Sequence, residues 1–559
     1  MKTKQLPLKG AIVALLLTIP FYFYGCDITD PLDGISVILD AKERETTISL
    51  IIRDAATNEP VGFEDNQTVT ITLAGEEQDQ VIDLINRSRS SFETRRGFVS
   101  FAIRDGRLPS VQNPVELIAQ INTSSDDYIP VSKRLFVNST GSNVFELQMV
   151  NRNALPRGVN GGVGASLTSV SSDTGTDTDV ILGQAELGAE TPLRLTIPQG
   201  TRLLDANGNA LTGELSVEAY HFSHKDLEAL QSYPGGLSGT VSNIDEFPGH
   251  GIANLLQGES NVSFTPAGFI SVALTISGQP VRSADGLMEF YIGIPDDVFN
   301  RSGERVTVGS NVPIWSYDRE IAEWRFEAIA EVQQTPSDNP DFGSDFPSNF
   351  VMGTTNHFSF WAAADAAPVC RTGASITLSG LQMPVIGRLL RTDTDIPGGV
   401  FLGLFPSEVN ERGERFIDLT NVSGEIPAML EIINLSGEII DTVEIPDACT
   451  SENIVVDFTS VEQMVITFRG TGVCSNTDVK VNPSVPIFIR PDVSGAQWLH
   501  VGNTSRGEIT LGIPGPGNYS FGLYFEDRWY QYEADLSGFT DGDVYSETIE
   551  LPDDICADL

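Results

Sequence analysis

Histidine is scarce in this chain, which limits the chemistry available to it. The 559 residues include five histidines, few for a metal or acid-base centre: His221, His224, His250, His357 and His500. Residues three apart on a strand point to opposite faces, so His221 and His224 would chelate a metal only within a helix. The HExxH, P-loop and GxSxG motifs are absent as well. We therefore predict no catalytic residue and no bound metal.

A hydrolase is the less favoured alternative. It stays open because a catalytic triad can be assembled from residues that are distant in sequence and leave no short motif. Such a site would need a deep pocket in the central domain that holds His221, His250 or His357 near carboxylates. Paired carboxylates carry no weight by themselves, since 76 acidic residues guarantee many chance pairs.

Basic residues are also few. The chain has 34 Lys and Arg against 76 Asp and Glu, a formal net charge of −42, which excludes duplex nucleic acid as a partner. We interpret the acidity as a solubility feature. The stretch Asp173–Asp179 spaces carboxylates as calcium loops do, but it lacks the downstream glutamate of an EF-hand. We predict a plain loop and no cofactor, with calcium as the open alternative.

No apolar stretch is long enough for a confident membrane-spanning helix, which needs about 20 residues. The apolar run 11–20 follows three lysines and leads to Gly25-Cys26, the layout of a signal peptide over residues 1–25. Gly25-Cys26 resembles a bacterial lipobox. The resemblance implies a lipid on Cys26 and a tether over residues 26–33. The membrane partner would then be one of the bacterial envelope, at the outer membrane or cell surface.

Cysteine is rare, and lipidation of Cys26 would leave an even set of four: Cys370, Cys449, Cys474 and Cys556. In an exported protein, disulfides are the default interpretation, and four cysteines permit three connectivities. The similar endings EIPDAC and ELPDDIC occur at Cys449 and Cys556, at nearly equal spacings from Cys370 and Cys474. We therefore favour Cys370–Cys449 and Cys474–Cys556, each tying the first strand to the last in two tandem modules, residues 366–460 and 461–559.

Helix signals are few, whereas the two-residue period of β-strands runs through most of the chain. It is clear in Thr46–Ile52 and Thr68–Leu73, between turns rich in Gly, Pro, Asn and Asp. Short helices are expected over Gln78–Asn86 and His224–Gln231. The pattern predicts an all-β protein of tandem immunoglobulin-like β-sandwich domains with a larger β-rich central domain.

The N-terminal part, residues 34–150, contains two segments that resemble a known domain. Arg53–Gly62 and Tyr128–Ser132 are similar to the carboxypeptidase regulatory-like β-sandwich of the immunoglobulin type. The resemblance implies a non-catalytic accessory unit. Residues 151–179, rich in Gly, Ser, Thr and Asp, predict a solvated linker to the next domain.

The central domain, residues 180–365, carries the stretches LDANGNALTG, YPGGL and NHFSFW. Their order resembles a β-rich module of multidomain lipoproteins of Bacteroidota-type bacteria and, distantly, of cartilage intermediate layer proteins. The resemblance implies no catalytic centre. We expect the large aromatic residues of this domain in its core: Trp315, Trp324, Phe358, Phe360 and Trp361.

The last module contains the candidate ligand-binding residues, Tyr524 and Trp529. If Glu526-Asp527 is a two-residue hairpin turn, Tyr524 and Trp529 face each other across the strands. The opposite face then carries Phe521, Leu523, Phe525, Tyr530 and Tyr532. Flat aromatic side chains stack on sugars, which predicts a carbohydrate-binding surface. Packing of the pair against a neighbouring module is the alternative.

These features predict a non-enzymatic, membrane-anchored envelope or cell-surface lipoprotein that acts as a binding or structural scaffold. A carbohydrate-binding accessory protein of a surface glycan system is the main alternative. Besides the membrane, a glycan or another envelope protein is the expected partner.

Overall fold

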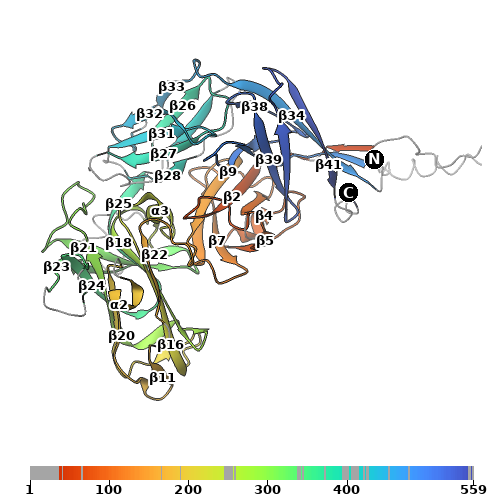
Figure 1. The fold of residues 1–559 in the computed structure, drawn as a ribbon. Coiled ribbons are helices and arrows are strands. Elements are labelled where there is room, and N and C mark those ends of the chain that lie inside the picture. Colours follow the sequence, from red (N-terminus) through yellow and green to blue (C-terminus); the bar gives the residue numbers. More distant parts are fainter. Residues whose placement is uncertain are drawn as a thin grey trace, which may run out of the picture.

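The computed structural model describes most of the chain from residue 37 onward, and β-strands dominate it (Figure 1). It covers residues 37–551 and Cys556 except 41, 64–66, 165–166, 189–190, 245–255, 257–259, 337–341, 343–344, 371–372, 393–401, 405–413, 420–421, 424–426, 451–452 and 476–478. Within these ranges the helices are η1 (Gln78–Gln80), α2 (Gln184–Leu187) and α3 (Leu227–Gln231). None of them is long and apolar enough to cross a membrane. The predicted all-β class is confirmed.

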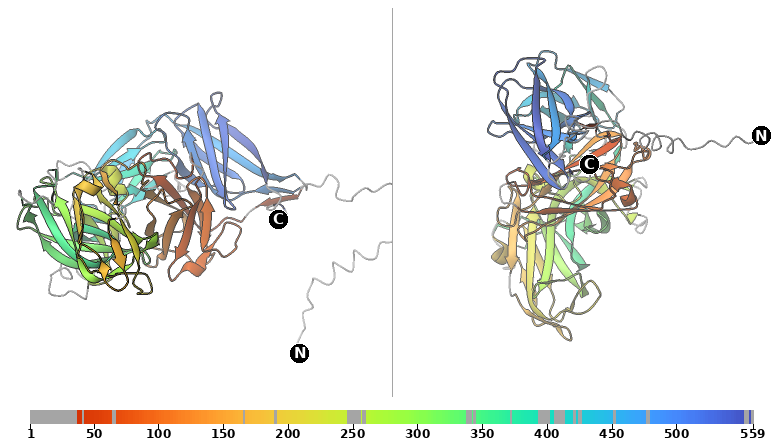
Figure 2. Two further views of the ribbon diagram at one scale, coloured as in Figure 1. Left: turned by 60° about the horizontal axis from the view of Figure 1, so that its bottom comes forward. Right: turned by 90° about the vertical axis from the view of Figure 1, so that its right-hand side faces the viewer.

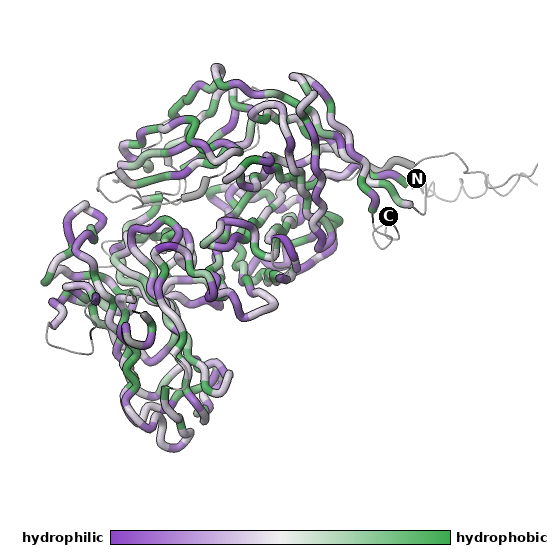
Figure 3. The backbone as a smooth tube through the Cα atoms, in the orientation of Figure 1, coloured by the Kyte–Doolittle hydropathy of each residue, from purple (hydrophilic) through white to green (hydrophobic). Residues whose placement is uncertain are grey.

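The first module is a two-layer sandwich with sheets β4-β6-β2-β9 and β5-β3-β7-β8. Its first strand, β2 (Thr46–Asp54), pairs in parallel with its last, β9 (Gly141–Met149). The others are β3 (Val69–Ala74), β4 (Val81–Ile82), β5 (Ser91–Thr94), β6 (Phe98–Ile103), β7 (Val115–Thr123) and β8 (Val131–Val137). Along β3 every second residue is buried, and hydrophobic and hydrophilic positions alternate along many strands (Figure 3).

The penultimate module repeats this topology. Its sheets are β29-β26-β33 and β28-β27-β31-β32, and its first strand pairs in parallel with its last, β33. The strands are β26 (Ser375–Ser379), β27 (Ile386–Arg391), β28 (Leu402–Leu404), β29 (Arg415–Asp418), β30 (Val422–Ser423), β31 (Ala428–Ile433), β32 (Ile439–Ile445) and β33 (Asn453–Asp457).

The last module is a third copy of the same arrangement. Strand β34 lies between β38 and β41 in one sheet, the other sheet is β37-β36-β39-β40, and β34 and β41 are parallel. The strands are β34 (Met464–Cys474), β35 (Val479–Asn482), β36 (Pro486–Pro491), β37 (Leu499–Asn503), β38 (Glu508–Ile513), β39 (Asn518–Phe525), β40 (Arg528–Asp535) and β41 (Val544–Leu551). The repeat that the cysteine spacing indicated for two modules therefore extends to the first.

The central domain consists of an eleven-stranded sheet around β16-β18-β25-β21-β22 and a six-stranded sheet around β14-β20-β24. Its strands are β10 (Val159–Gly164), β11 (Ser169–Ser171), β12 (Gly175–Thr176), β13 (Val180–Leu182), β14 (Leu193–Ile197), β15 (Leu203–Leu204), β16 (Gly213–Phe222), β17 (Ser238–Thr240), β18 (Asn261–Ile276), β19 (Gln279–Pro280), β20 (Ser283–Ile294), β21 (Asn311–Asp318), β22 (Glu323–Glu331), β23 (Gln333–Gln334), β24 (Asn349–His357) and β25 (Phe360–Cys370).

The aromatic residues of the central domain are core residues, as predicted. Trp315, Trp324, Phe360 and Trp361 are buried, and Phe358 is half-buried against the core that contains Trp361. The face of the large sheet that carries Trp315 and Trp324 also packs against first-module residues such as Ile118 and Val150. The first module and the central domain therefore share a hydrophobic core.

The solvated linker predicted over residues 151–179 is wrong. β10 pairs with β16 from Val159 opposite Phe222 to Gly164 opposite Val217, so this segment belongs to the central sheet. A Cβ atom at Gly161 would overlap the backbone of Ala219 and Tyr220. The glycines therefore permit close strand packing here, and their number does not mark a flexible connection.

The two predicted helices fare differently. From Gln78 onward only the 3-10 turn η1 forms, because Val81 and Ile82 are buried and pair with β6 as strand β4. The prediction over Gln78–Asn86 is therefore wrong. The second prediction is confirmed in its later part, where α3 covers Leu227–Gln231 and buries Ala229 and Leu230.

The first module contacts the last, although the central domain and the penultimate module separate them in the sequence. Asn503 Nδ2 donates to Thr47 Oγ1 at 3.0 Å, and Arg53 Nη2 donates to the Trp498 carbonyl at 2.9 Å. In addition, β1 (Val37–Asp40) pairs in parallel with β35 at the edge of the last module. In both views of Figure 2 the first module lies between the central domain and the last module.

The disulfides are Cys370–Cys449 and Cys474–Cys556, the two pairs that the tandem endings favoured. Cys474 ends β34, the first strand of the last module. Cys370, however, ends β25, which begins in the central domain, and Cys449 precedes β33. The first disulfide therefore ties the central domain's last strand to the penultimate module, where the sequence suggested a bridge within one module.

Candidate functional site

The hairpin with the candidate ligand-binding residues has the predicted register. Tyr524 in β39 pairs with Trp529 in β40, and Glu526-Asp527 forms the turn. Both turn residues have positive φ, 50° and 56°, as a type I′ turn requires. Trp529 also lies over Gly522, where a Cβ atom would overlap its ring. Glycine at position 522 therefore provides the space for the indole.

The pair does not form a sugar-binding platform. Tyr524 is 2% exposed, and its hydroxyl lies 3.0 Å from the Glu93 carbonyl of the first module and 2.7 Å from Asp527 Oδ1. Trp529 stacks on Phe98 of the first module with ring centres 4.2 Å apart and planes 13° from parallel. A sugar ring cannot reach the covered face. The carbohydrate prediction for these residues is wrong, and the alternative of packing against a neighbouring module holds.

The surroundings of this pair form an aromatic junction between the first and last modules. Phe98 from β6 and Phe488 and Trp498 from the last module are 0% exposed. Trp498 meets Phe98 and Trp529 edge-on, with ring centres 5.9 and 5.3 Å apart. Sequence analysis missed Phe98 and Trp498, because no local pattern indicates a partner some 400 residues away.

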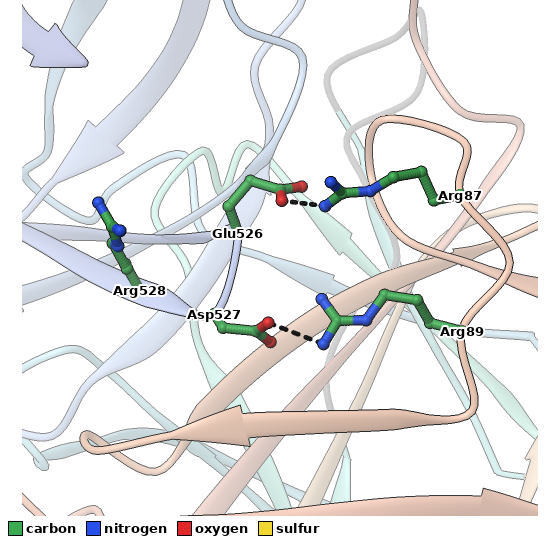
Figure 4. Close-up of a pocket in the computed structure, with 5 residues that line it drawn as sticks. All are labelled: Arg87, Arg89, Glu526, Asp527 and Arg528. Carbon is green, nitrogen blue, oxygen red and sulfur yellow. Dashed lines mark hydrogen bonds and ion pairs between the residues drawn. The ribbon is translucent and has the colours of Figure 1, made fainter. Parts of the chain in front are cut away.

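A charged hollow of about 490 Å³ lies at the rim of this junction (Figure 4). Arg87 pairs with Glu526, and Arg89 Nη2 lies 2.7 Å from Asp527 Oδ2. Arg87 Nε is also 2.7 Å from Asp83 Oδ2. Burial raises the pKa of Glu526, while its ion pair with Arg87 opposes that shift. Each carboxylate of the turn thus pairs with an arginine of the first module, and these ion pairs connect the two modules at the edge of the aromatic junction.

No histidine that the structure describes lines the charged hollow, and two of them lie beside carboxylates elsewhere, His224 beside Asp297 and His357 beside Glu327. His221 is 5% exposed, and its burial lowers its pKa to about 3, with a smaller effect from His224. His224 Nε2 lies 3.3 Å from Asp297 Oδ1, and burial lowers its pKa too. His357 stacks on Trp361. His250 lies outside the described residues.

His500 is separate from these, in the last module. Its ring lies edge-on to Phe488 with centres 5.5 Å apart, and burial lowers its pKa to about 3. Neither His500 nor His221 lines the charged hollow. Within the described ranges no group of three His, Cys, Asp or Glu side chains is placed to hold a metal ion, and Asp173–Asp179 contains strand β12.

We expect His221→Leu to make the protein less sensitive to acid. Above pH 6.5, the pKa of an unfolded histidine, the ring is neutral in both states and does not affect the free energy of unfolding. Between pH 6.5 and 3 the ring binds a proton in the unfolded chain and stays neutral in the folded chain, so the free energy of unfolding falls as the pH falls. At pH 5, His221 lowers the free energy of unfolding of the wild type by about 2 kcal/mol. The drop in unfolding free energy between pH 7 and 5 should therefore be about 2 kcal/mol smaller in the variant.

Denaturant unfolding at both pH values measures this difference. Val217→Leu is the matched control, because Val217 lies on the same strand and faces the same core without a titrating group. An identical pH dependence in His221→Leu and the wild type would contradict the prediction.

Comparison with known proteins adds little to this picture. No family model matches the chain, and no curated protein matches it. Solved structures similar to it include the TIE protein of Bacillus anthracis, at 10% identity over 70% of this chain and 58% of that one, with a TM-score of 0.14.

Two pilins are also similar: the major pilin subunit of Bacillus cereus (9% identity, 90% of this chain, 98% of that one, TM-score 0.13) and the RrgB pilus protein of Streptococcus pneumoniae (8%, 92%, 99%, 0.12). The match to the TIE protein, in contrast, covers 58% of that protein, which is less than two thirds of its length. At these TM-scores the chains do not superpose as wholes, so no functional argument follows from the likeness.

Proposed function

We propose that this chain is a non-enzymatic scaffold of the bacterial envelope, anchored through a lipid on Cys26, that holds its central domain away from the membrane. The expected location is the outer membrane or cell surface. The pairing of β1 with β35 is the observation that carries the proposal. Strand β1 is the part of the described chain that is nearest to Cys26 in the sequence, and this pairing holds it against the last module.

The distances agree with such an arrangement. Ten residues, 27–36, separate Cys26 from Val37, and they span at most about 35 Å when fully extended. The β1–β35 edge would therefore stay close to the membrane. The central domain lies at the opposite end of the molecule from β1 (Figure 1). A scaffold of this shape would present the central domain to partners.

The contacts between units support a rigid scaffold. Tyr317 of the central domain donates its hydroxyl to the Ser132 carbonyl of the first module at 2.9 Å, and Arg152 pairs with Glu218 across the same boundary. With the aromatic junction on its other side, the first module is held from two directions. His221 is buried and lines neither of the two hollows, so it gives no support to a catalytic site there.

Replacement of Cys26 by Ser is expected to release the protein from the membrane, because the acyl chains supply the anchoring energy at about 0.8 kcal/mol per buried methylene. The variant should move from the detergent phase to the aqueous phase in Triton X-114 partitioning and should lose labelling by a palmitate analogue. Cys556→Ser, which also removes one cysteine, is the control and should stay with the detergent.

Retention of Cys26→Ser in the detergent phase would refute the anchor. The non-enzymatic part is tested separately with the purified wild-type protein. Turnover of polysaccharide, peptide or ester substrates would overturn it, and the absence of turnover is the expected result.

A further inference from the structure

A second hollow, of about 190 Å³, lies in the central domain, away from the aromatic junction. It is bordered by β18, β21 and the connection from β20 to β21. Two irregularities of the sheet flank it: β18 shifts register between Pro266 and Gly268, and β21 shifts between Ile314 and Trp315. Such bulges bend a strand and redirect its side chains, and they are frequent next to binding sites.

The hollow combines polar groups with one aromatic ring. Its lining includes Thr265, Phe299, Glu304, Arg305, Asn311 and Asp365. The connection is ordered by hydrogen bonds: Asn300 Nδ2 donates to Glu304 Oε2 at 3.2 Å, and the Arg301 amide donates to Asp365 Oδ2 at 3.2 Å. The Arg305 guanidinium lies 5.5 Å from the Phe299 ring centre. Acceptors and donors thus surround an aromatic ring that the Arg305 guanidinium covers on one face, a combination that can orient a small polar ligand.

The charges of the lining exclude several kinds of ligand. Glu304 and Asp365 outnumber Arg305, and the whole chain has a formal charge of −42, so an anion is repelled. A tightly held metal ion needs more ligands, and the described residues include no group of three His, Cys, Asp or Glu side chains suited to a metal. The carboxylates of the lining already accept hydrogen bonds, Glu304 from Asn300 and Asp365 from the Arg301 amide, and an apolar molecule would cover them without adding another. A neutral, hydroxyl-rich molecule satisfies all of these conditions.

We propose that this hollow binds one pyranose unit of a neutral glycan. The sugar hydroxyls donate to Glu304 and Asp365 and accept from Asn311 and Arg305, while an apolar face of the sugar ring packs near Phe299. The volume is below the range of about 300–1,000 Å³ for drug-sized ligands, so a terminal unit fits better than the middle of a chain. The site moves the carbohydrate hypothesis from Tyr524 and Trp529 to the central domain.

Saturation-transfer NMR with the purified full chain tests this proposal. The probes are the methyl pyranosides of glucose, galactose and mannose and, as a charged comparison, methyl glucuronide. Asn311 is exposed at the start of β21, so Asn311→Trp fills the hollow without disturbing the core. Thr354→Trp is the matched control, because Thr354 is exposed on β24 and does not line the hollow.

We expect transfer to at least one neutral pyranoside, a loss of affinity of about tenfold or more in Asn311→Trp, and unchanged transfer in Thr354→Trp. Methyl glucuronide should bind about tenfold more weakly than methyl glucoside, because its carboxylate meets Glu304 and Asp365. Absence of transfer to every neutral probe overturns the proposal. Equal transfer in Asn311→Trp and wild type, or equal loss in both Trp variants, overturns it as well. None of these results depends on the lipid anchor.

Discussion

Replacement of Trp498 by Ala is expected to lower the free energy of unfolding by about 3–5 kcal/mol and to separate the unfolding of the first and last modules. The Trp498 ring is fully buried and contacts Phe98 of the first module as well as Trp529 of the last. The cavity would therefore open in the core that the two modules share. Denaturant unfolding combined with hydrogen exchange measures both effects, since exchange reports which strands open first.

Val493→Ala is the control for the Trp498 variant. Val493 lies in the connection between β36 and β37 and is 53% exposed, so its truncation should change stability by no more than about 0.5 kcal/mol. The aromatic junction would lose its assigned role if Trp498→Ala unfolded at the wild-type denaturant concentration in a single transition. The rim ion pairs of Arg87 and Arg89 are expected to contribute little in compensation, because these pairs are partly open to solvent and are screened by water and salt.

Local features of the last module could be predicted from the sequence. A two-residue turn at Glu526-Asp527 between alternating aromatic strands defines a hairpin register, and Tyr524 does pair with Trp529. The disulfide pairs followed from a repeated ending and similar spacing. The hairpin register is local, because the period of two determines which side chains share a face, and the disulfide pairs became visible only by comparing two similar segments of the chain.

Contacts between units could not be predicted in this way. The hydrophobic pattern placed Tyr524 and Trp529 on the outer face of their hairpin, which is correct, but it does not tell whether solvent or another module covers that face. Phe98 covers it here. The parallel pairing of β1 with β35 joins residues more than 430 positions apart, and its backbone hydrogen bonds leave no specific signature in either segment.

Composition misled the interpretation of residues 151–179. Gly and Ser are common in flexible linkers, and they are also needed where two strands approach closely. Gly161 lies against the backbone of Ala219 and Tyr220, so its lack of a side chain serves packing. A flexible linker and a tightly paired strand can therefore have similar composition, and only the partner strand β16 distinguishes them.

Loss of the Cys370–Cys449 disulfide is expected to destabilise the penultimate module by up to about 4.5 kcal/mol, the chain-entropy value for a loop of 79 residues. The effect should extend to the connection with the central domain. Cys370 ends β25, and the same end of β25 pairs with β30 through Val369 and Cys370. Without the bridge, the chain connection from Cys370 to Ser375 and this two-residue pairing would be the links between β25 and the penultimate module.

A comparison of two double variants tests the position of the effect. Cys370→Ser/Cys449→Ser should raise hydrogen exchange in β26 to β33, whereas Cys474→Ser/Cys556→Ser, which opens a loop of 82 residues, should raise it in β34 to β41. The losses in stability should be similar, because loop-closure entropy changes little between these lengths. Unchanged exchange in β26 to β33 after loss of the first disulfide would show that packing alone holds that module, and that the bridge from β25 adds no stability.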